Sequence, residues 1–587
     1  MNKRKLIIII TSRITPPHHR FLQGLINGAY NSGCDTAVFS VFSENNEESS
    51  HQTGEEYIYD LINFERADGI FFDDSSFWCE RMLKKTADII KKKSTSPVLC
   101  LNSDTATQYG FYNLKISDKT CFSETVSHLI EKHNLCDIIC LTGTKGTFEA
   151  EERLRGYLDI MKKHNLPVPS ENIRYGDFWN EAAKKLASDI YSGKIHKPEA
   201  IACASDTMAT ALINALLEKK IRVPEDIAVT GFDASDSAFL STPSLTTYSP
   251  PEYQYGLSCT KKLLDLIFKR DSYTPTSPFK GDLITNCSCG CSEHNYKSIE
   301  NIREKILSLK EAEEKADFGN ISEQLLSSSD INELEIALDR LTYLIDGYDR
   351  YFLCLNEEVF SHERSGHSPF SPQMLIALEK AEYIRVSRNI SFKSANMLPA
   401  LLEKRSTPDV FFFTPVHFGK KCYGFSAVSF KDKSSFPNSI YRELNHNISN
   451  ALHFLEVRSV ISGQGSNSNI NIPQSQNIPI APHWFFELIS LMSKKENFTA
   501  GLPRMLEAAH MSQEHLTRVF KKYTGITPTQ YINDLRLEYA ATLIIDKGTE
   551  ISDACFLSGF NNISHFYHQF KRKYGCSPKQ YLAKMQK

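Results

Sequence analysis

The sequence predicts a multidomain protein with an α/β body of two lobes, a middle α+β domain and an all-α C-terminal domain. Three observations lead to this fold class. Short apolar runs alternate with amphipathic stretches up to about residue 290, a polar uncharged segment lies at 463–480, and the residues after it contain a repeat. At roughly 150 residues per domain, a chain of 587 residues has room for about four domains.

The composition is that of an ordinary globular protein, with 41% hydrophobic and 23% charged residues. No run of 18 apolar residues is present, so we expect no membrane-spanning helix. The apolar run Leu6–Ile10 after MNKRK is too short for a signal peptide, and no cleavage site follows it. We therefore expect a cytoplasmic protein whose 15 scattered cysteines are reduced.

The first 292 residues alternate predicted strands with predicted helices. The strands are 6–10, 36–42, 69–72, 97–101, 137–141, 200–203 and 227–230, and the helices are 21–31, 119–133, 149–164, 180–191 and 206–219. Strands that are apolar throughout and alternate with helices predict parallel sheets covered on both faces. Ligands of such sheets bind beyond the carboxyl ends of the strands, so we expect the functional residues there.

Residues 293–462 form the next predicted domain, and 463–480 form a flexible linker. The expected elements are a heptad stripe (Ile299, Ile302, Ile306, Leu309), a helix at 331–345, strands at 351–355, 410–416 and 422–430, and a helix with a second stripe (Leu444, Ile448, Leu452, Leu455). The strand pattern VFFFTPVHFGKKCYGFSAVSF (410–430) resembles that of GAF-type small-molecule domains. Each stripe could either pair in a homodimer or pack on its own domain.

The last predicted domain, 481–587, contains the repeat. SQEHLTRVFKKYTGITPTQY (512–531) and NISHFYHQFKRKYGCSPKQY (562–581) share seven identities at an offset of 50. Each copy reads as an amphipathic helix that follows a shorter helix and a tight turn, which is the plan of a helix-turn-helix. The domain has 14 Lys and Arg against 9 Asp and Glu, a net charge of +5, so the remaining residues carry −3 − 5 = −8.

A basic module on an acidic body favours nucleic-acid binding. The side chains expected at base edges are Gln513, Glu514, Thr517 and Arg518 in the first copy and Asn562, Ser564, His565 and Gln569 in the second. Those expected at phosphates are Lys521, Lys522, Lys571 and Arg572, with Lys573 beside them. The alternative is that these are ordinary surface polar residues of a solvated helix.

The stretch EAAHMSQEHLTRVFKKYTGITPTQYINDLRLEYAATLI and the later SDACFLSGFNNISHFYHQFKRKYGCSPKQYL resemble the DNA-binding domain of AraC/XylS-type transcription regulators. The resemblance covers about 498–585 and implies two recognition helices in successive major grooves of double-stranded DNA, joined by a linker helix at about 533–545. One departure is Leu506, where many relatives have a small alanine between helices; Ala554 keeps the small residue in the second copy.

Four runs in the N-terminal body resemble periplasmic-binding-protein-like sensor domains of the lac-repressor type: ERLRGY (152–157), CASDTMATALINAL (203–216), VPEDIAVTGFDAS (223–235) and PSLTTYSPP (243–251). The resemblance implies a small-molecule effector, in most relatives a carbohydrate, bound between two lobes. The residues it places at the effector are Asp233, Glu151, His18, Ser205 and Asn102. Asp233 would accept hydroxyl groups, and Glu151 would make the site acidic where sugar-binding relatives have Arg. Each could instead be an ordinary loop residue.

The sequence carries no recognisable catalytic or cofactor motif. Cys287, Cys289 and Cys291 form a C-x-C-x-C run, but zinc sites usually take four ligands in two pairs, and His294 is the single further candidate nearby, so we expect no metal. The prediction is a cytoplasmic, effector-controlled DNA-binding transcription regulator, without cofactor or membrane partner. A homodimer is expected, and the transcription machinery is a further candidate partner. The alternatives are an enzyme acting on the same ligand and a solute-binding component.

Overall fold

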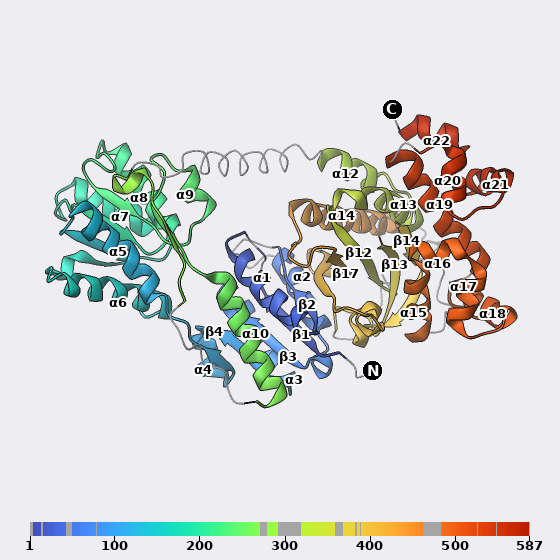
Figure 1. Cartoon of the computed structure of the whole chain (residues 1–587), viewed down its shortest axis with the longest axis horizontal. Helices are drawn as coiled ribbons and strands as arrows, with labels where there is room; N and C mark the ends of the chain where they lie inside the picture. The colour runs from blue at the N-terminus through green and yellow to red at the C-terminus, as the bar shows by residue number, and fades with distance from the viewer. Residues whose placement is uncertain are drawn as a thin grey trace. The chain divides into compact units, whose positions relative to one another are not determined.

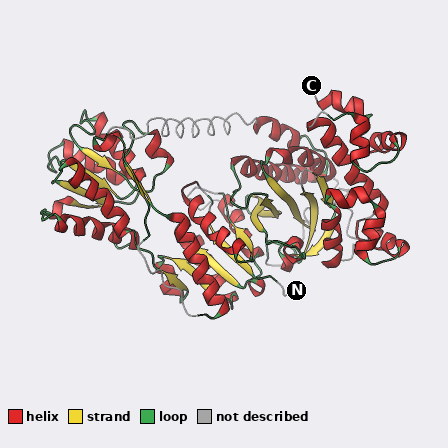
Figure 2. Cartoon of the chain, in the orientation of Figure 1, coloured by secondary structure: helices red, strands yellow, loops and turns green. Residues whose placement is uncertain are grey.

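The computed structural model of the chain describes residues 4–12, 14, 16–42, 50–77, 79–270, 279–291, 318–357, 368–381, 384–387, 389–461, 483–524, 526–546 and 549–585 (Figures 1 and 2). The chain folds as two compact units. The first unit comprises 1–14, 29–96 and 317–587, and the second comprises 15–28 and 97–316. Among the described helices, none combines the length and apolar character needed to cross a membrane.

The second unit contains a parallel sheet in the order β7-β6-β8-β9. Its strands are β6 (Ile138–Thr142), β7 (Ile173–Tyr175), β8 (Ala200–Cys203) and β9 (Ala228–Thr230), and its helices are α5 (Lys119–His133), α6 (Phe148–Lys163), α7 (Asn180–Tyr191) and α8 (Asp206–Glu218). Strands β6, β8 and β9 are buried along their whole length, as expected for parallel strands covered on both faces. Side chains from the strands and all four helices form one apolar core.

The second unit also contains other strands and helices. These are β4 (Val98–Leu101) paired with β5 (Tyr112–Leu114), β10 (Thr247–Ser249) paired with β11 (Asp282–Ile284), α4 (Asp104–Tyr109), α9 (Asp236–Leu240), α10 (Glu252–Phe268) and α1 (Pro16–Asn31) up to residue 28. Helices α1 and α10 approach so closely that a Cβ on Gly24 would lie 2.0 Å from the carbonyl oxygen of Tyr253. Only glycine fits at such a helix crossing.

The first unit is built on a sheet in the order β14-β13-β12-β17-β16-β2-β1-β3, with β15 paired to β13. Its strands are β1 (Leu6–Thr11), β2 (Asp35–Phe39), β3 (Gly69–Asp73), β12 (Tyr348–Asn356), β13 (Gln373–Ala381), β14 (Ile384–Ser387), β15 (Ile390–Lys393), β16 (Val410–Phe418) and β17 (Lys421–Phe430). The strands β1 to β3 are parallel, whereas β12 to β17 pair antiparallel. Accompanying helices are α2 (Ser50–Glu56), α3 (Glu80–Lys93), α12 (Phe318–Leu326), α13 (Ile331–Leu341) and α14 (Ser439–Ile461).

The two halves of this sheet meet where β2 pairs with β16 in parallel, from Thr36 opposite Val410 to Phe39 opposite Phe413. The rings of Phe39 and Phe413 stack across the junction with centroids 4.6 Å apart. A single sheet therefore runs from the N-terminal strands into the middle domain, through residues more than 370 positions apart in the sequence.

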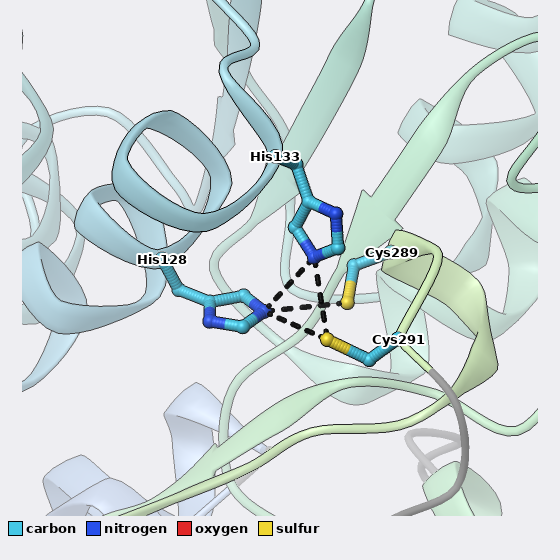
Figure 3. Close-up of side chains that lie close together, drawn as sticks. All are labelled: His128, His133, Cys289 and Cys291. Carbon is cyan, nitrogen blue, oxygen red and sulfur yellow. Dashed lines mark hydrogen bonds between the residues drawn. The ribbon is translucent and has the colours of Figure 1, made fainter.

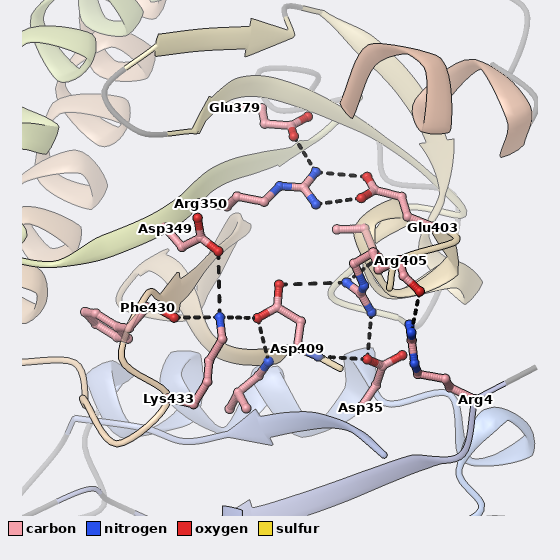
Figure 4. Close-up of polar contacts among 12 residues, drawn as sticks. Arg4, Asp35, Asp349, Arg350, Glu379, Glu403, Arg405, Asp409, Phe430 and Lys433 are labelled. Atoms are coloured by element: carbon pink, nitrogen blue, oxygen red, sulfur yellow. Dashed lines mark hydrogen bonds and ion pairs between the residues drawn. The ribbon is translucent and has the colours of Figure 1, made fainter. Parts of the chain in front are cut away.

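Buried charges reinforce this junction (Figure 4). The carboxylate of Asp35 pairs with Arg405 at 2.8 Å and accepts the backbone N–H of Asp409 at 2.9 Å. Asp409 in turn pairs with Lys433 at 2.7 Å, and Arg4 donates to the carbonyl of Arg405. These contacts hold β2 against the segment that begins β16.

The C-terminal part of the first unit is entirely helical among its described residues. Its helices are α15 (His483–Met492), α16 (Lys495–Ala500), α17 (Leu502–Ala509), α18 (Gln513–Thr524), α19 (Pro528–Asp546), α20 (Ile551–Leu557), α21 (Ile563–Tyr574) and α22 (Pro578–Met585). The long helix α19 packs against α16, α17 and α18 on one side of the repeat and against α20, α21 and α22 on the other. It also packs on β14 of the middle domain.

The middle domain has the α+β character that the sequence predicts, including the hairpin between β16 and β17. The family models matched below cover other segments, so its likeness to GAF-type domains is not confirmed. The heptad stripe at 299–309 and the linker at 463–480 lie outside the described residues. Leu444, Ile448, Leu452 and Leu455 are buried in α14 within the chain itself, so this second stripe packs on its own domain rather than offering a surface for a homodimer.

Candidate DNA interface and effector site

The C-terminal repeat forms two helix-turn-helix units whose recognition helices are offset by 50 residues. Helices α17 and α18 make the first, α20 and α21 the second, and the bounds of α18 and α21 differ by 563 − 513 = 50 and 574 − 524 = 50. Each turn needs a residue with positive φ: His510 at 50° in the first and Gly559 at 94° in the second. Each recognition helix buries a pair of apolar side chains, Leu516 and Phe520 in α18 and Phe566 and Phe570 in α21. Because these side chains face the core, the opposite face of each helix points outward.

The outward face of α18 carries the side chains that the sequence assigned to DNA. Exposed residues are Gln513, Glu514, Arg518, Lys521 and Lys522. Thr517 is half-buried, and its hydroxyl donates to the carbonyl of Gln513 at 2.7 Å, so it is the least available of the set. No described contact ties Arg518 to an acidic partner, which leaves its guanidinium free to reach a base edge.

In α21, Ser564, His565, Lys571 and Arg572 are exposed. Asn562 is the N-cap, and its side chain accepts the N–H of His565 at 2.9 Å. Gln569 is half-buried and lies 3.2 Å from the His565 ring. Thus Asn562 positions the helix, while the exposed residues after it remain available for DNA.

Lys573 has a different role from the neighbouring Lys571 and Arg572. Its ammonium pairs with Glu538 of α19 at 2.6 Å, so it is not free for a phosphate. The other oxygen of Glu538 accepts the backbone N–H of Arg385 in β14 at 2.7 Å. One carboxylate therefore ties the second recognition helix to the sheet of the middle domain.

The second unit holds a buried charge cluster centred on Arg153. Its guanidinium donates to Asp118 at 3.0 Å and to the carbonyl of Ala204, and lies 3.6 Å from Asp233. It stacks 4.1 Å from the ring centre of Phe232. Its Nε is buried and has no hydrogen-bond partner among the described residues. The Arg153 guanidinium therefore faces two carboxylates, and its Nε–H group remains available to a ligand.

The surroundings make this cluster reluctant to carry its full negative charge. Burial raises the pKa of Asp233 to about 7, against the opposing effect of Arg153 and with a further rise caused by Asp118. Burial also raises the pKa of Glu252 to about 8 and that of Asp206 to about 8, each with a contribution from Asp233. A ligand that donates hydrogen bonds or carries positive charge would favour the ionised forms.

The other predicted effector residues lie on several elements of the second unit. Asn102 follows β4, and its side-chain amide donates to the carbonyl of Ile116 at 3.0 Å and accepts the N–H of Ile116 at 2.8 Å. Burial raises the pKa of Glu149. Ser205 follows β8 and caps α8, accepting the N–H of Met208 at 3.2 Å. His18 lies half-buried in the first turn of α1.

Glu151 is placed differently from Asp233. Its carboxylate accepts the N–H of Gly146 at 3.0 Å and the hydroxyl of Tyr175 at 3.4 Å, whereas Arg153, two residues later, turns into the cluster. The acidic character expected from Glu151 comes instead from Asp118 and Glu149. Sequence reasoning missed Asp118, although its place directly before α5 at the edge of the sheet was a usable signal.

Comparison with known proteins matches two domains of the chain. A family model described as a helix-turn-helix domain matches residues 505–584, and one described as a periplasmic binding protein-like domain matches 126–282. The chain is 25% identical over 286 residues to the transcriptional repressor PurR of Aliivibrio fischeri, covering 49% of this chain and 81% of PurR. It is 26% identical to CytR of Escherichia coli K12, covering 45% and 73%, and 27% identical to the probable repressor ExuR of Bacillus subtilis, covering 36% and 62%.

These relatives are transcriptional repressors rather than enzymes. The periplasmic binding protein-like model matches the N-terminal half of the chain, and the helix-turn-helix model matches the opposite end. The chain is therefore an effector-controlled DNA-binding transcription regulator that joins a periplasmic-binding-protein-like sensor domain, of the kind found in lac-repressor-type proteins, to an AraC-type helix-turn-helix domain.

Proposed function

We propose that the effector is a neutral polyhydroxyl molecule, such as a carbohydrate, held by Asp233 and Arg153. The observation that carries this proposal is the buried cluster at the carboxyl ends of the sensor strands. A carboxylate accepts several charge-assisted hydrogen bonds from hydroxyl groups, and the unpaired Nε of Arg153 needs an acceptor, which a sugar oxygen supplies.

The balance of charge argues against phosphorylated and acidic effectors. Arg153 is the cation of the cluster, and Asp118 already holds it at 3.0 Å. Burial raises the pKa values of Asp233, Glu149 and Glu252, so the site already resists negative charge and disfavours a phosphate. A neutral sugar or polyol adds no negative charge, and a cationic ligand is the second class that fits.

We further propose that effector binding changes DNA affinity through the first unit. A ligand shifts such an equilibrium only by binding one arrangement of the sensor better than another. The junction of β2 with β16 and the contacts of Glu538 with β14 and Lys573 provide a continuous set of packed elements from N-terminal strands to recognition helix. The chain would act in the cytoplasm as a homodimer, because two linked DNA modules bind paired sites with high effective concentration.

The effector proposal is tested by thermal shift of the full chain against neutral sugars, polyols, sugar phosphates and sugar acids. We expect stabilisation by a neutral member and its loss in Asp233→Asn, while the exposed Asp236→Asn three residues later should retain it. Stabilisation by a sugar phosphate, or full retention in Asp233→Asn, would contradict the assigned site.

DNA reading is tested by selecting binding sites from random DNA with the full chain. Arg518→Ala should relax the preference at one base position, since a bidentate contact to guanine is worth about 1–3 kcal/mol of discrimination. Lys571→Ala should weaken all sites alike and make the slope of log K against log salt shallower by about 0.9. Lys420→Ala, an exposed lysine in the turn after β16, is the matched control and should change neither.

The homodimer is tested by sedimentation velocity of the full chain with and without its selected DNA site. A chain that stays monomeric at concentrations that saturate the DNA would show that pairing is not part of its function.

A further inference from the structure

Two histidines and two cysteines converge in the second unit, away from the carboxylate cluster (Figure 3). His128 lies on α5, and His133 is the last residue of that helix. Cys289 ends the short 3-10 helix Cys287–Cys289, and Cys291 follows it after Gly290. The four donor atoms, two imidazole nitrogens and two sulfurs, all lie within 4.8 Å of one another.

The separations of these atoms match those around a tetrahedral metal ion. His128 Nε2 is 3.3 Å from His133 Nε2 and 3.4 Å from the sulfur of both Cys289 and Cys291, and Cys291 Sγ is 3.3 Å from His133 Nε2. With Zn–N bonds of about 2.0–2.1 Å and Zn–S bonds of about 2.3 Å, a tetrahedron places two nitrogens about 3.3 Å apart and a nitrogen and a sulfur about 3.6 Å apart. The observed distances agree to within a few tenths of an ångström.

Ordinary hydrogen bonding does not account for this arrangement. A ring nitrogen carries either one hydrogen or one lone pair, so it serves one partner at a time. His128 Nε2 has three heteroatoms within 3.4 Å. A metal ion bound by all four donor atoms accounts for all three short distances.

We propose that His128, His133, Cys289 and Cys291 form a structural zinc site of the Cys2His2 type. Two thiolates and two imidazoles in a tetrahedron are the donor set that zinc prefers among biological metals. Four protein ligands fill the coordination sphere and leave no position for water or substrate, which is the mark of a structural rather than a catalytic site.

The loop that carries the cysteines is held in place for this role. Gly290 adopts φ 95°, a left-handed conformation that turns both neighbouring cysteines toward α5. The hydroxyl of Ser288 donates to the carbonyl of Val229 at 2.6 Å and accepts the N–H of Thr246 at 2.8 Å. The Thr246 hydroxyl lies 3.0 Å from Cys289 Sγ, where it can support a thiolate, as partners of metal ligands commonly do.

The sequence alone could not reveal this site. The two cysteines form one recognisable pair, but the histidines lie 156 to 163 residues earlier and belong to a helix, where they resemble ordinary polar positions. The metal would fasten Cys291, the last described residue before 292–317, to the end of α5. It would thus fix the loop that carries the two cysteines to this lobe of the sensor.

The test is the metal content of the full chain purified under reducing conditions without chelators. We expect one zinc per chain by mass spectrometry, and after exchange with cobalt the intense visible absorption of a tetrahedral Co²⁺–thiolate site. Cys291→Ser and His133→Asn should bind zinc more than about tenfold more weakly in a chelator competition, because removing even an indirect partner of a ligand commonly costs 10–100-fold.

Two variants serve as matched controls. Cys136→Ser removes an exposed thiol three residues after His133, and Cys287→Ser removes the remaining thiol of the C-x-C-x-C run. Both should keep one zinc at wild-type affinity. The assignment is overturned if the wild-type chain neither contains zinc nor gives the cobalt spectrum after reconstitution, if Cys291→Ser and His133→Asn bind zinc as tightly as wild type, or if Cys287→Ser loses it. The cobalt spectrum of the wild type decides the question even if a ligand variant fails to fold.

Discussion

Removing the carboxylate of Asp35 should open the junction between β2 and β16. Asp35 is buried, and its oxygens serve both Arg405 at 2.8 Å and the N–H of Asp409 at 2.9 Å. Burial raises the pKa of Asp35 in spite of Arg405, so the ion pair itself adds little net stability. The cost of Asp35→Ala arises from the partners it leaves behind, a buried guanidinium and a buried N–H without their acceptor.

The magnitude follows from these contacts. Breaking a buried pair by removing one partner costs about 3–5 kcal/mol. Arg405 retains a hydrogen bond to the carbonyl of Ala400 at 2.9 Å and lies 3.9 Å from the carboxylate of Asp409, so the cost belongs at the lower end, about 3 kcal/mol. Since 1.4 kcal/mol corresponds to a factor of ten, amide exchange at the junction should accelerate by about a hundredfold.

Hydrogen exchange followed by mass spectrometry measures this locally in the full chain, which is preferable to global unfolding in a protein with several domains. Peptides covering 36–39 and 410–413 should lose protection together, while those of β6 and β8 should not change. The double variant Asp35→Ala/Arg405→Leu should recover part of the lost amide protection, since it also removes the buried guanidinium that has no carboxylate partner in Asp35→Ala. Glu80→Ala, which breaks a surface pair with Lys84, should have no measurable effect. Unchanged protection of 36–39 in Asp35→Ala would refute the reasoning.

Three further outcomes are expected. Glu252 has a pKa raised by burial to about 8, so it keeps a proton in the folded protein that the unfolded chain loses above about pH 4; stability should fall as pH rises from about 5 to 8, and Glu252→Gln should flatten that dependence in thermal melts. Asn562→Ala removes the N-cap of α21 and should cost about 1 kcal/mol of stability and weaken DNA binding in a titration, whereas a variant that binds normally would show that the cap is dispensable. Gly424→Ala would place a Cβ 2.0 Å from the carbonyl oxygen of Cys354 at φ 155° and should abolish folding as judged by circular dichroism, while Gly193→Ala, at φ 72° in open space, should fold.

The sequence was sufficient to predict those helices whose bounds follow from local apolar periodicity and turn residues. The bounds of α5 and α7 agree with those predicted, because each helix has a clear apolar period and a turn signal at its ends. The spacing of the two helix-turn-helix units was predictable since the repeat preserves it. Short or half-exposed strands such as β5 and β7 were missed because they are only three residues long and carry no continuous apolar run.

Contacts between distant segments could not be predicted. Nothing in the composition of Asp35–Phe39 indicates that it pairs with Val410–Phe413, and the predicted division at residue 292 separates the two strands. The same limitation applies to the effector site. The resemblance to lac-repressor-type sensors predicted a role for Asp233, but the inward turn of Arg153 depends on Asp118 and Phe232, which approach it only in the folded unit.

The junction of β2 with β16 also determines how this protein can be divided. A fragment that ends at residue 292 would leave the backbone groups of β2 that face β16 without partners, among them the N–H groups of Thr36 and Ser40, which now donate to the carbonyls of Asp409 and Phe413. Such an exposed edge, flanked by apolar side chains, recruits strands from other molecules and leads to aggregation. Expression of the sensor by itself should therefore retain residues 317–461, and exchanging sensors between regulators of this architecture would require moving the middle domain as well.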